Sequence, residues 1–177
     1  MKIGVLSDTH LTIPSRGFHR VAQKIRNKRS IEDLREIIHQ HFIGVELILH
    51  AGDFVVEAVF EMLQEFAPVE AVRGNMDHVG IQHRFSDRTI VEINNLKIGL
   101  IHGNGAPQGI VERVGQCFTD TDVAAIVFGH SHQPLNEKRD NILFFNPGSP
   151  TDRIFAPYTS VGILKVTDTI TGQIIPL

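Results

Sequence analysis

Short apolar runs, each followed by a polar residue or a glycine, recur along the chain. They lie at 3–6, 47–49, 69–72, 98–101 and 124–128. Runs of this length that end at a turn are typical of buried β-strands. In the first half of the chain they alternate with stretches whose apolar residues have helical spacing. This alternation predicts parallel strands joined by right-handed crossovers.

Three segments carry helix signals. Ser30 with an acid three residues later, at Asp33, predicts the capped start of a helix that continues to Phe42. Apolar residues three and four positions apart predict two further helices, over 55–66 and 108–118.

Beyond residue 75 strand patterns predominate. Residues 89–93 alternate in polarity, Asn94-Asn95 suits a hairpin turn, and 97–101 forms the returning strand. Further strands are predicted at 142–145, 161–166 and 172–176. We therefore predict an α/β fold in which two mixed sheets pack together with helices outside. No repeat, low-complexity tract or linker divides the chain, so we expect one domain over residues 1–177.

Composition narrows the functional classes. No apolar stretch approaches the roughly 18 residues that a membrane span needs, and Met1-Lys2-Ile3 leads straight into the first strand, so we expect neither a membrane segment nor a signal peptide. The single cysteine, Cys117, excludes an internal disulfide and fits a reducing, cytoplasmic setting. A net charge of −3 gives no overall attraction to nucleic acid.

The polar residues that follow the strands are metal-ligand types. They are Asp8, His10, Asp53, Asn75, His102, His130 and His132. A lone His-x-His is more often a pair of exposed loop histidines that bind nothing. Here, however, ligand-type residues recur at five strand ends, and the sites of open α/β sheets form beyond the carboxyl ends of strands. Residues two apart on extended backbone point the same way, so His130 and His132 are expected to reach one point.

Two carboxylates, one amide and four imidazoles are too many ligands for one ion. We therefore predict two metal ions, with Asp53 as the natural bridge. Nitrogen and oxygen donors without thiolate favour Mn²⁺, our first choice, or Ni²⁺, Fe²⁺, Co²⁺ or Zn²⁺ over Ca²⁺ or Mg²⁺. Such a pair, about 3.5–4 Å apart, activates a water and holds the oxygens of a phosphoester. Phosphoester hydrolysis is the leading hypothesis, with Asp53, Asn75 and His102 as catalytic residues.

The ordered motifs resemble the calcineurin-like metallophosphoesterase superfamily. They read Asp8-x-His10, Gly52-Asp53, Gly74-Asn75, His102-Gly103 and Gly129-His130-x-His132. The short length and the segment 146–149 are similar to the small bacterial and archaeal phosphodiesterase branch of the YfcE type, whose fold the retromer subunit Vps29 shares. The resemblance spans residues 8–149 and implies a metallo-dependent phosphatase-like fold, a four-layer α/β/β/α sandwich with a dinuclear centre at one edge of the sheets.

The resemblance also implies how the ligands divide between the metals. One ion would take Asp8, His10 and His132, the other Asn75, His102 and His130, with Asp53 shared. A bridging hydroxide would then attack phosphorus directly. The loop at 146–150 would lie beside the metal motifs and support them.

The chain departs from the family pattern in two places. Met76 stands where many relatives have a histidine that protonates the leaving oxygen, which favours substrates whose leaving group needs little protonation. His78 is a candidate substitute, although a solvated loop histidine is the preferred interpretation. Asn104 stands where relatives often have histidine, and we predict that it and Arg153 contact the substrate phosphate.

Three functions remain open. The first is a phosphodiesterase acting on a small soluble phosphodiester, plausibly as a homo-oligomer. The second is a protein-binding scaffold of the Vps29 kind, although Vps29-type chains have lost several of the metal-position residues that are all present here. The third and weakest is a nuclease, because the chain has no basic footprint overall. A basic stretch at 16–29 either attracts a polyanionic substrate or is a solvated helix face, and we favour the second reading.

Overall fold

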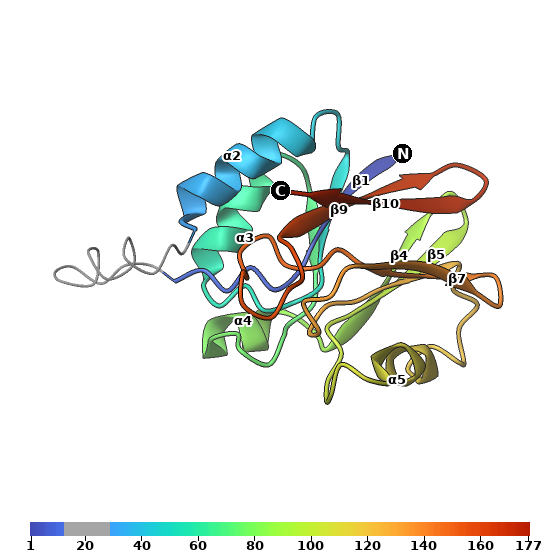
Figure 1. Ribbon diagram of the computed structural model, residues 1–177. Coiled ribbons are helices and arrows are strands. Elements are labelled where there is room, and N and C mark those ends of the chain that lie inside the picture. Colours follow the sequence, from blue (N-terminus) through green and yellow to red (C-terminus); the bar gives the residue numbers. More distant parts are fainter. Residues whose placement is uncertain (13–28) are drawn as a thin grey trace, which may run out of the picture.

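The computed structural model describes residues 1–12 and 29–177, and its strands form two five-stranded sheets (Figure 1). The first sheet has the order β10-β9-β1-β2-β3. Its strands are β1 (Lys2–Leu6), β2 (Leu47–His50), β3 (Val69–Ala71), β9 (Ser160–Val166) and β10 (Ile170–Pro176). β1, β2 and β3 are parallel, whereas β9 is antiparallel to both β1 and β10. The sheet is therefore mixed, as predicted.

The second sheet has the order β4-β5-β6-β8-β7 and is also mixed. Its strands are β4 (Arg88–Ile93), β5 (Leu96–Ile101), β6 (Ala125–Val127), β7 (Leu135–Arg139) and β8 (Ile142–Asn146). β5, β6 and β8 are parallel, and β4 and β7 close the edges in antiparallel fashion. The edge strand β7 was not predicted, because its sequence LNEKR is polar and only partly buried and so carries no apolar signal.

The described helices are α2 (Ile31–His41), α3 (Glu57–Gln64), α4 (Val79–Arg84) and α5 (Ile110–Gln116). The predicted cap of α2 is confirmed, since Ser30 Oγ accepts from the Asp33 N–H and the Asp33 carboxylate accepts from the Ser30 N–H. The helices predicted over 55–66 and 108–118 are shorter at both ends. The short α4 was missed, because six residues with one buried side chain, Ile81, give no periodicity to detect.

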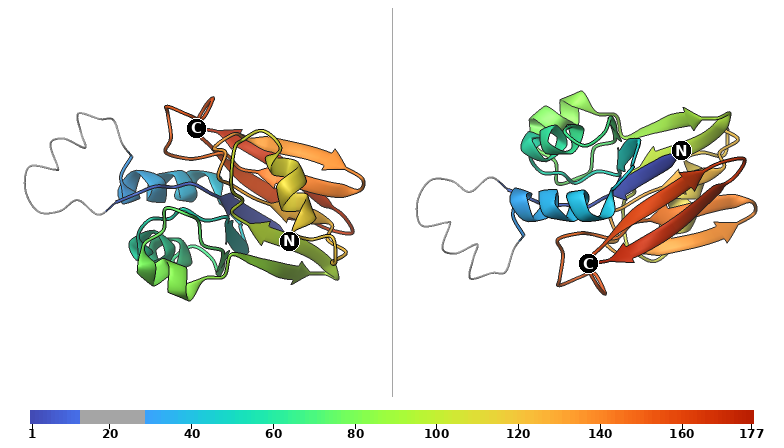
Figure 2. Two further views of the ribbon diagram at one scale, coloured as in Figure 1. Left: turned by 90° about the horizontal axis from the view of Figure 1, so that it is seen from below. Right: turned by 90° about the horizontal axis from the view of Figure 1, so that it is seen from above.

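Three apolar clusters separate four layers. α2 and α3 pack on the outer face of the first sheet through residues such as Leu34 and Leu63. The two sheets pack face to face through residues such as Val5 and Ile98. α5 packs on the outer face of the second sheet, where Val114 lies among the third cluster. The four-layer α/β/β/α sandwich predicted by the resemblance is confirmed. In Figure 2, α5 (yellow) lies in front of the strands when seen from below and behind them when seen from above.

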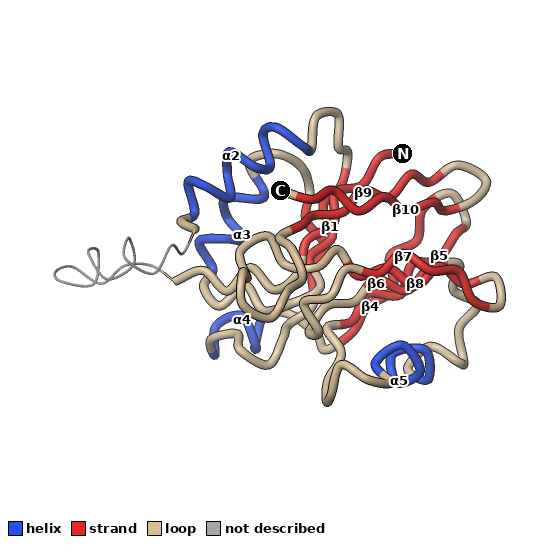
Figure 3. The backbone as a smooth tube through the Cα atoms, viewed as in Figure 1, coloured by secondary structure: helices blue, strands red, loops and turns tan. Residues whose placement is uncertain are grey.

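The loops that leave the parallel strands gather at one end of both sheets (Figure 3). Backbone hydrogen bonds join them directly. The Asp8 N–H donates to the Gly52 carbonyl at 3.0 Å, and the His10 N–H donates to the Asp53 carbonyl at 3.1 Å. The segments after β1 and β2 therefore run side by side and present their polar side chains together. None of the described helices is both long enough and apolar enough to cross a bilayer.

Candidate metal centre

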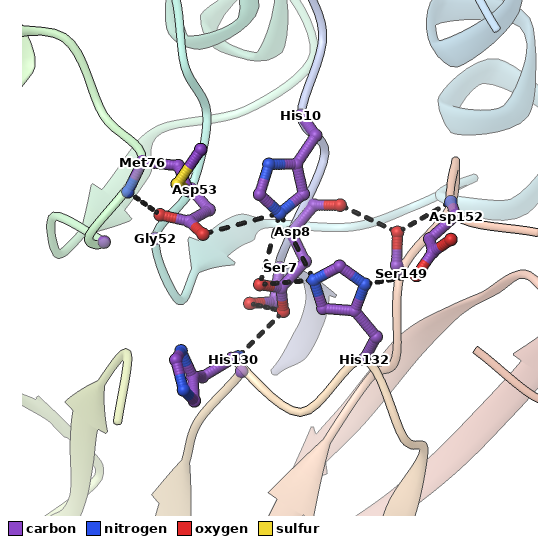
Figure 4. A network of polar contacts seen from close by, with 12 residues as sticks. Ser7, Asp8, His10, Gly52, Asp53, Met76, His130, His132, Ser149 and Asp152 are labelled. Carbon is purple, nitrogen blue, oxygen red and sulfur yellow. Dashed lines mark hydrogen bonds and ion pairs between the residues drawn. The ribbon is translucent and has the colours of Figure 1, made fainter. Parts of the chain in front are cut away.

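The structure brings all of the predicted ligand residues into one network of polar contacts. Figure 4 shows part of it, with the side chains of Asp8, His10, Asp53 and His132 facing one another. Asn75, His102 and His130 continue the network on one side. These residues come from the loops after β1, β2, β3, β5 and β6.

The Asp8 carboxylate is fully buried and only half satisfied. Its Oδ2 accepts hydrogen bonds from Ser7 Oγ at 2.7 Å and from the His130 N–H at 2.9 Å. Its Oδ1 has no hydrogen-bond partner among the described residues. Buried carboxylate oxygens without a partner are costly, and a cation beside one removes that cost.

Three imidazoles surround this unpartnered oxygen. The distances from Asp8 Oδ1 to the Nε2 atoms are 3.4 Å for His132, 3.8 Å for His10 and 4.0 Å for His102. The Nε2 atoms of His10 and His132 are themselves 3.2 Å apart. Two imidazole lone pairs repel at this distance, so a proton or a metal ion must lie between them.

Asp53 stands between the two halves of the network. Its Oδ1 accepts from the Met76 N–H at 2.7 Å, which fixes the carboxylate plane. Its Oδ2 lies 3.4 Å from His10 Nε2 and 3.4 Å from His102 Nε2. One carboxylate oxygen equidistant from two imidazoles is the arrangement expected of a shared ligand.

Asn75 links His102 and His130 on the other side of the network. Its Oδ1 is 3.2 Å from His102 Nε2 and 3.1 Å from His130 Nδ1. The far nitrogens of both rings are held by backbone carbonyls, His102 Nδ1 by Ala51 at 2.7 Å and His130 Nε2 by Gly105 at 2.8 Å. In the neutral form of such a ring, the N–H donated to the carbonyl leaves the other nitrogen as the one that a metal would use.

The backbone of the centre differs from the sequence prediction. We expected His130 and His132 to lie on extended backbone, and this was wrong, although both side chains do join the network. Five of the predicted ligands have left-handed backbone: Asp8 (φ 53°), His10 (φ 42°), Asp53 (φ 59°), His130 (φ 66°) and His132 (φ 56°). Non-glycine residues adopt this conformation at a cost of about 1–3 kcal/mol each, and such strain gathers at functional sites. Successive left-handed turns, not strand alternation, direct these side chains inward.

The glycines of the motifs allow the loops to approach closely. A Cβ at Gly74 would lie 2.1 Å from Asp53 Oδ1, and one at Gly129 would lie 1.8 Å from Ser7 Oγ. Neither position accepts a side chain without moving a carboxylate-bearing loop. Gly74, next to Asn75, and Gly129, next to His130, are therefore required by the close approach of the loops.

The ionisation of the centre reflects the close carboxylates and imidazoles. Burial by itself raises the pKa of Asp8 and of Asp53, but the close approach and positive charge of the His132 and His102 rings bring the net pKa of both below the usual value. Burial by itself lowers the pKa of His102 and of His132, but their carboxylate partners raise both to about 9. Protons on these two rings therefore balance the carboxylates at neutral pH, where metal ions would otherwise supply the positive charge.

This balance predicts proton release when a metal binds. A metal requires a neutral Nε2, so Mn²⁺ added to chelator-treated protein at pH 7 must displace protons from His102 and His132. We expect release of about one to two protons per chain, and an apparent affinity that rises about tenfold per pH unit for each displaced proton below pH 9. Titration calorimetry in two buffers of different ionisation enthalpy measures the protons. Binding without release would contradict these ionisation states.

Asp77 is a supporting residue that the sequence reading missed. Its buried carboxylate accepts backbone N–H groups from Val55 at 2.7 Å, Gly74 at 2.7 Å and Asp53 at 3.1 Å. It thus fastens the loop carrying Asp53 to the loop carrying Asn75. The available signal was an acid two positions after Asn75.

Asp152 is a second supporting residue that was missed. Its Oδ2 accepts from Nδ1 of His132, and its Oδ1 accepts the Ile154 N–H at 2.8 Å. A carboxylate behind an imidazole fixes the ring and raises the basicity of the nitrogen that faces the centre. Nothing in its sequence position, 20 residues after His132, pointed to this contact.

The loop at 146–150 supports the centre as the resemblance implied. Asn146 Nδ2 donates to the Gly129 carbonyl at 3.0 Å and to Ser131 Oγ at 3.1 Å, which holds the turn that carries His130 and His132. Ser149 Oγ donates to the Asp8 carbonyl at 2.7 Å.

The remaining candidates lie outside the network. Met76 is 56% exposed and joins the centre only through its backbone N–H. His78 is exposed and forms the N-cap of α4. Asn104 is exposed and lines a cavity beside His102, whereas the exposed Arg153 has no hydrogen bond to any described residue. Of the basic stretch, residues 16–28 lie outside the described residues.

Comparison with known proteins identifies the family. The sequence matches the calcineurin-like phosphoesterase superfamily domain over residues 1–169. The chain belongs to this family. A relative from Methanothermobacter thermautotrophicus, named a probable metallophosphoesterase, is 36% identical over 168 residues, covering 94% of this chain and 86% of the relative. The matched region of this metallophosphoesterase includes all the residues of the network.

Solved structures agree with the fold. One described as a novel archaeal phosphodiesterase superposes with a TM-score of 0.70 at 26% identity and covers 100% of both chains. Vps29 from Entamoeba histolytica in complex with Zn²⁺ superposes with a TM-score of 0.70 at 20% identity and covers 99% of both chains. At 20% identity, the likeness to Vps29 shows only that this metallophosphoesterase has the same fold.

Proposed function

We propose that this metallophosphoesterase is a phosphodiesterase that hydrolyses a small soluble phosphodiester with two divalent transition metal ions. The observation that carries the proposal is the fully buried Asp8 Oδ1, which has no hydrogen-bond partner in the described chain and faces three imidazole Nε2 atoms. Such an oxygen fits a cation. The carboxylate, amide and imidazole donors around it, with no thiolate, favour a divalent transition metal, and we take Mn²⁺ as the first choice.

The geometry supports a division of the ligands into two sets. Asp8, His10 and His132 offer ligand atoms within 4.8 Å of one another, and so do Asp8, Asp53 and His102. Asn75 and His130 adjoin the second set. We assign the first ion to Asp8, His10 and His132, the second to Asn75, His102 and His130, with Asp53 shared. When bound, two such ions supply a water of lowered pKa and positive charge for the phosphoryl oxygens.

The other functions have weaker support. A Vps29-like scaffold rests on the fold alone, whereas the ligand residues here are complete and joined in one network. The name of the archaeal phosphodiesterase that superposes over its full length supports hydrolysis of a diester.

Metal removal and return test this function. Chelator-treated protein should hydrolyse bis-p-nitrophenyl phosphate at no more than the uncatalysed rate, and added Mn²⁺ should restore turnover as about two ions per chain are bound. The release of p-nitrophenol gives the rate, and elemental analysis gives the stoichiometry. Metal-loaded protein that binds two ions but leaves aryl diesters intact would contradict the phosphodiesterase proposal.

The side chain of Met76 limits the choice of leaving group. It has no proton to donate, and its 56% exposure leaves space beside the centre. We expect Met76→His to increase kcat/KM by about tenfold or more for alkyl phosphodiesters, whose leaving oxygen needs a proton, and to change aryl diesters little. Equal effects on the two substrate classes would show that the missing proton donor does not set this preference.

A further inference from the structure

A cavity of about 540 Å³ opens beside the centre on the side of Asn75 and His102. This volume lies within the range of small-molecule sites. Gly103 and Asn104, which follow His102, line it together with Arg73. A substrate whose phosphodiester lies at Asn75 and His102 would extend one arm into this space.

The cavity concentrates positive charge. The side chains that line it include the guanidinium groups of Arg73, Arg88 and Arg113 but only one carboxylate, Asp87. Asp87 pairs with Arg73 through an Nε–Oδ1 distance of 2.6 Å. Three arginines and one aspartate leave an excess of two positive charges among these side chains. The net charge of the whole chain is −3, so this excess is local.

The three arginines differ in how firmly the protein holds them. Arg113 donates from Nε, Nη1 and Nη2 to the carbonyls of Asn104, Gln108 and Ala106, and it thereby fixes the loop after His102. Arg73 is held by Asp87 and by the Gln82 carbonyl at 2.8 Å.

Arg88 makes fewer hydrogen bonds within the described chain than the other two arginines. Its Nη1 donates to the Cys117 carbonyl, and its guanidinium lies 6.0 Å from the ring of Phe118. It has no ion pair within the described chain, so most of its N–H groups remain available to a ligand. A guanidinium that is held at one point and otherwise unpaired suits bidentate recognition of a phosphate.

We propose that this cavity binds a second phosphate group of the substrate, so that the preferred substrate is a nucleotide-sized phosphodiester that also carries a phosphate monoester. This inference rests on the proposed phosphodiesterase function. The excess of two positive charges matches a dianionic phosphate monoester, and Arg88 is the residue that distinguishes such a substrate from a diester with no further charge.

A matched pair of substrates tests the inference on the Mn²⁺-loaded protein. Thymidine 5′-(p-nitrophenyl phosphate) and its 3′-phosphorylated form differ only in the added phosphate, and both release p-nitrophenol. We expect kcat/KM to be at least about tenfold higher for the 3′-phosphorylated form, since hydrogen bonds to charged groups contribute on this scale. In Arg88→Gln this preference should fall to about threefold or less.

Arg84→Gln is the matched control. Arg84 is also exposed and lies over an aromatic ring, at 4.3 Å from the centroid of Phe60, but it does not line the cavity. This variant should keep the full preference. Equal turnover of the two substrates by wild-type protein, or a preference unchanged in Arg88→Gln, would overturn the inference.

Binding without catalysis separates this inference from the proposed function. In chelator, adenosine 3′,5′-bisphosphate should bind wild-type protein more tightly than adenosine 5′-monophosphate, and Arg88→Gln should abolish the difference. If neither aryl diester is hydrolysed but this difference is observed, the phosphodiesterase proposal fails and the phosphate site stands. If both diesters are hydrolysed and the two nucleotides bind alike, the phosphate site fails and the phosphodiesterase proposal stands.

Discussion

Asp53→Asn is expected to lose at least about a hundredfold in kcat/KM for an aryl phosphodiester and to bind fewer metal ions. The Oδ2 atom of Asp53 is 3.4 Å from the Nε2 atoms of both His10 and His102, so the substitution removes the negative charge shared by the two halves of the centre. Even residues that only orient a metal ligand change affinity or activity about 10–100-fold. The fold should persist, because the amide oxygen of asparagine still accepts the Met76 N–H.

The control for this variant is Asp168→Asn, an exposed aspartate in the turn between β9 and β10. It should retain both activity and metal content. Elemental analysis, steady-state kinetics and a thermal melt of each variant together separate loss of metal from loss of fold. Full turnover by Asp53→Asn with both ions bound would refute the bridging role.

Asp77→Ala should destabilise the protein and weaken metal binding together. The substitution leaves the backbone N–H groups of Asp53, Val55 and Gly74 without their acceptor in a buried place. At about 1–3 kcal/mol for an unsatisfied buried group, and with partial relief by entering water, we expect a loss of about 3 kcal/mol. For a chain of this size that corresponds to a decrease in melting temperature of about 6–12 °C.

The melt of Asp77→Ala is measured in chelator, so that the change reflects the loops and not lost metal. Asp168→Ala serves as the control, because surface substitutions of this kind change stability by no more than about 0.5 kcal/mol. A separate titration with Mn²⁺ should show weaker binding by Asp77→Ala, since the loops of Asp53 and Asn75 are no longer fastened. A melting temperature unchanged by Asp77→Ala would mean that these bonds do not hold the two loops together.

The parts of the fold that sequence predicted are those with strong local signals. Buried strands such as β1 and β6 consist almost entirely of apolar residues, and the Ser30–Asp33 pair marks the start of α2 chemically. β7 and α4 lack such signals. The first is a polar edge strand whose place is set by pairing with β8, and the second is a short helix buried through Ile81 alone.

The sequence was enough to predict which residues lie together in the candidate centre, but not the backbone conformation that places them there. Strand-end position was enough to gather the ligand residues, because the loops after parallel strands meet at one end of a sheet. Their left-handed backbone, as at His130 and His132, was not predicted, since aspartate and histidine adopt this conformation more often than most residues but still at a minority of positions. The contact of Asp152 with His132 joins positions that only the tertiary fold brings together.

The proposed function requires the side chains around Asp8 Oδ1 to hold a pair of metal ions. Anomalous diffraction from crystals grown with Mn²⁺ locates such ions. We expect two peaks about 3.5–4 Å apart, one against Asp8, His10 and His132, the other against Asn75, His102 and His130, with Asp53 contacting both. A single peak, or no peak within reach of Asp8 in the presence of abundant Mn²⁺, would contradict it.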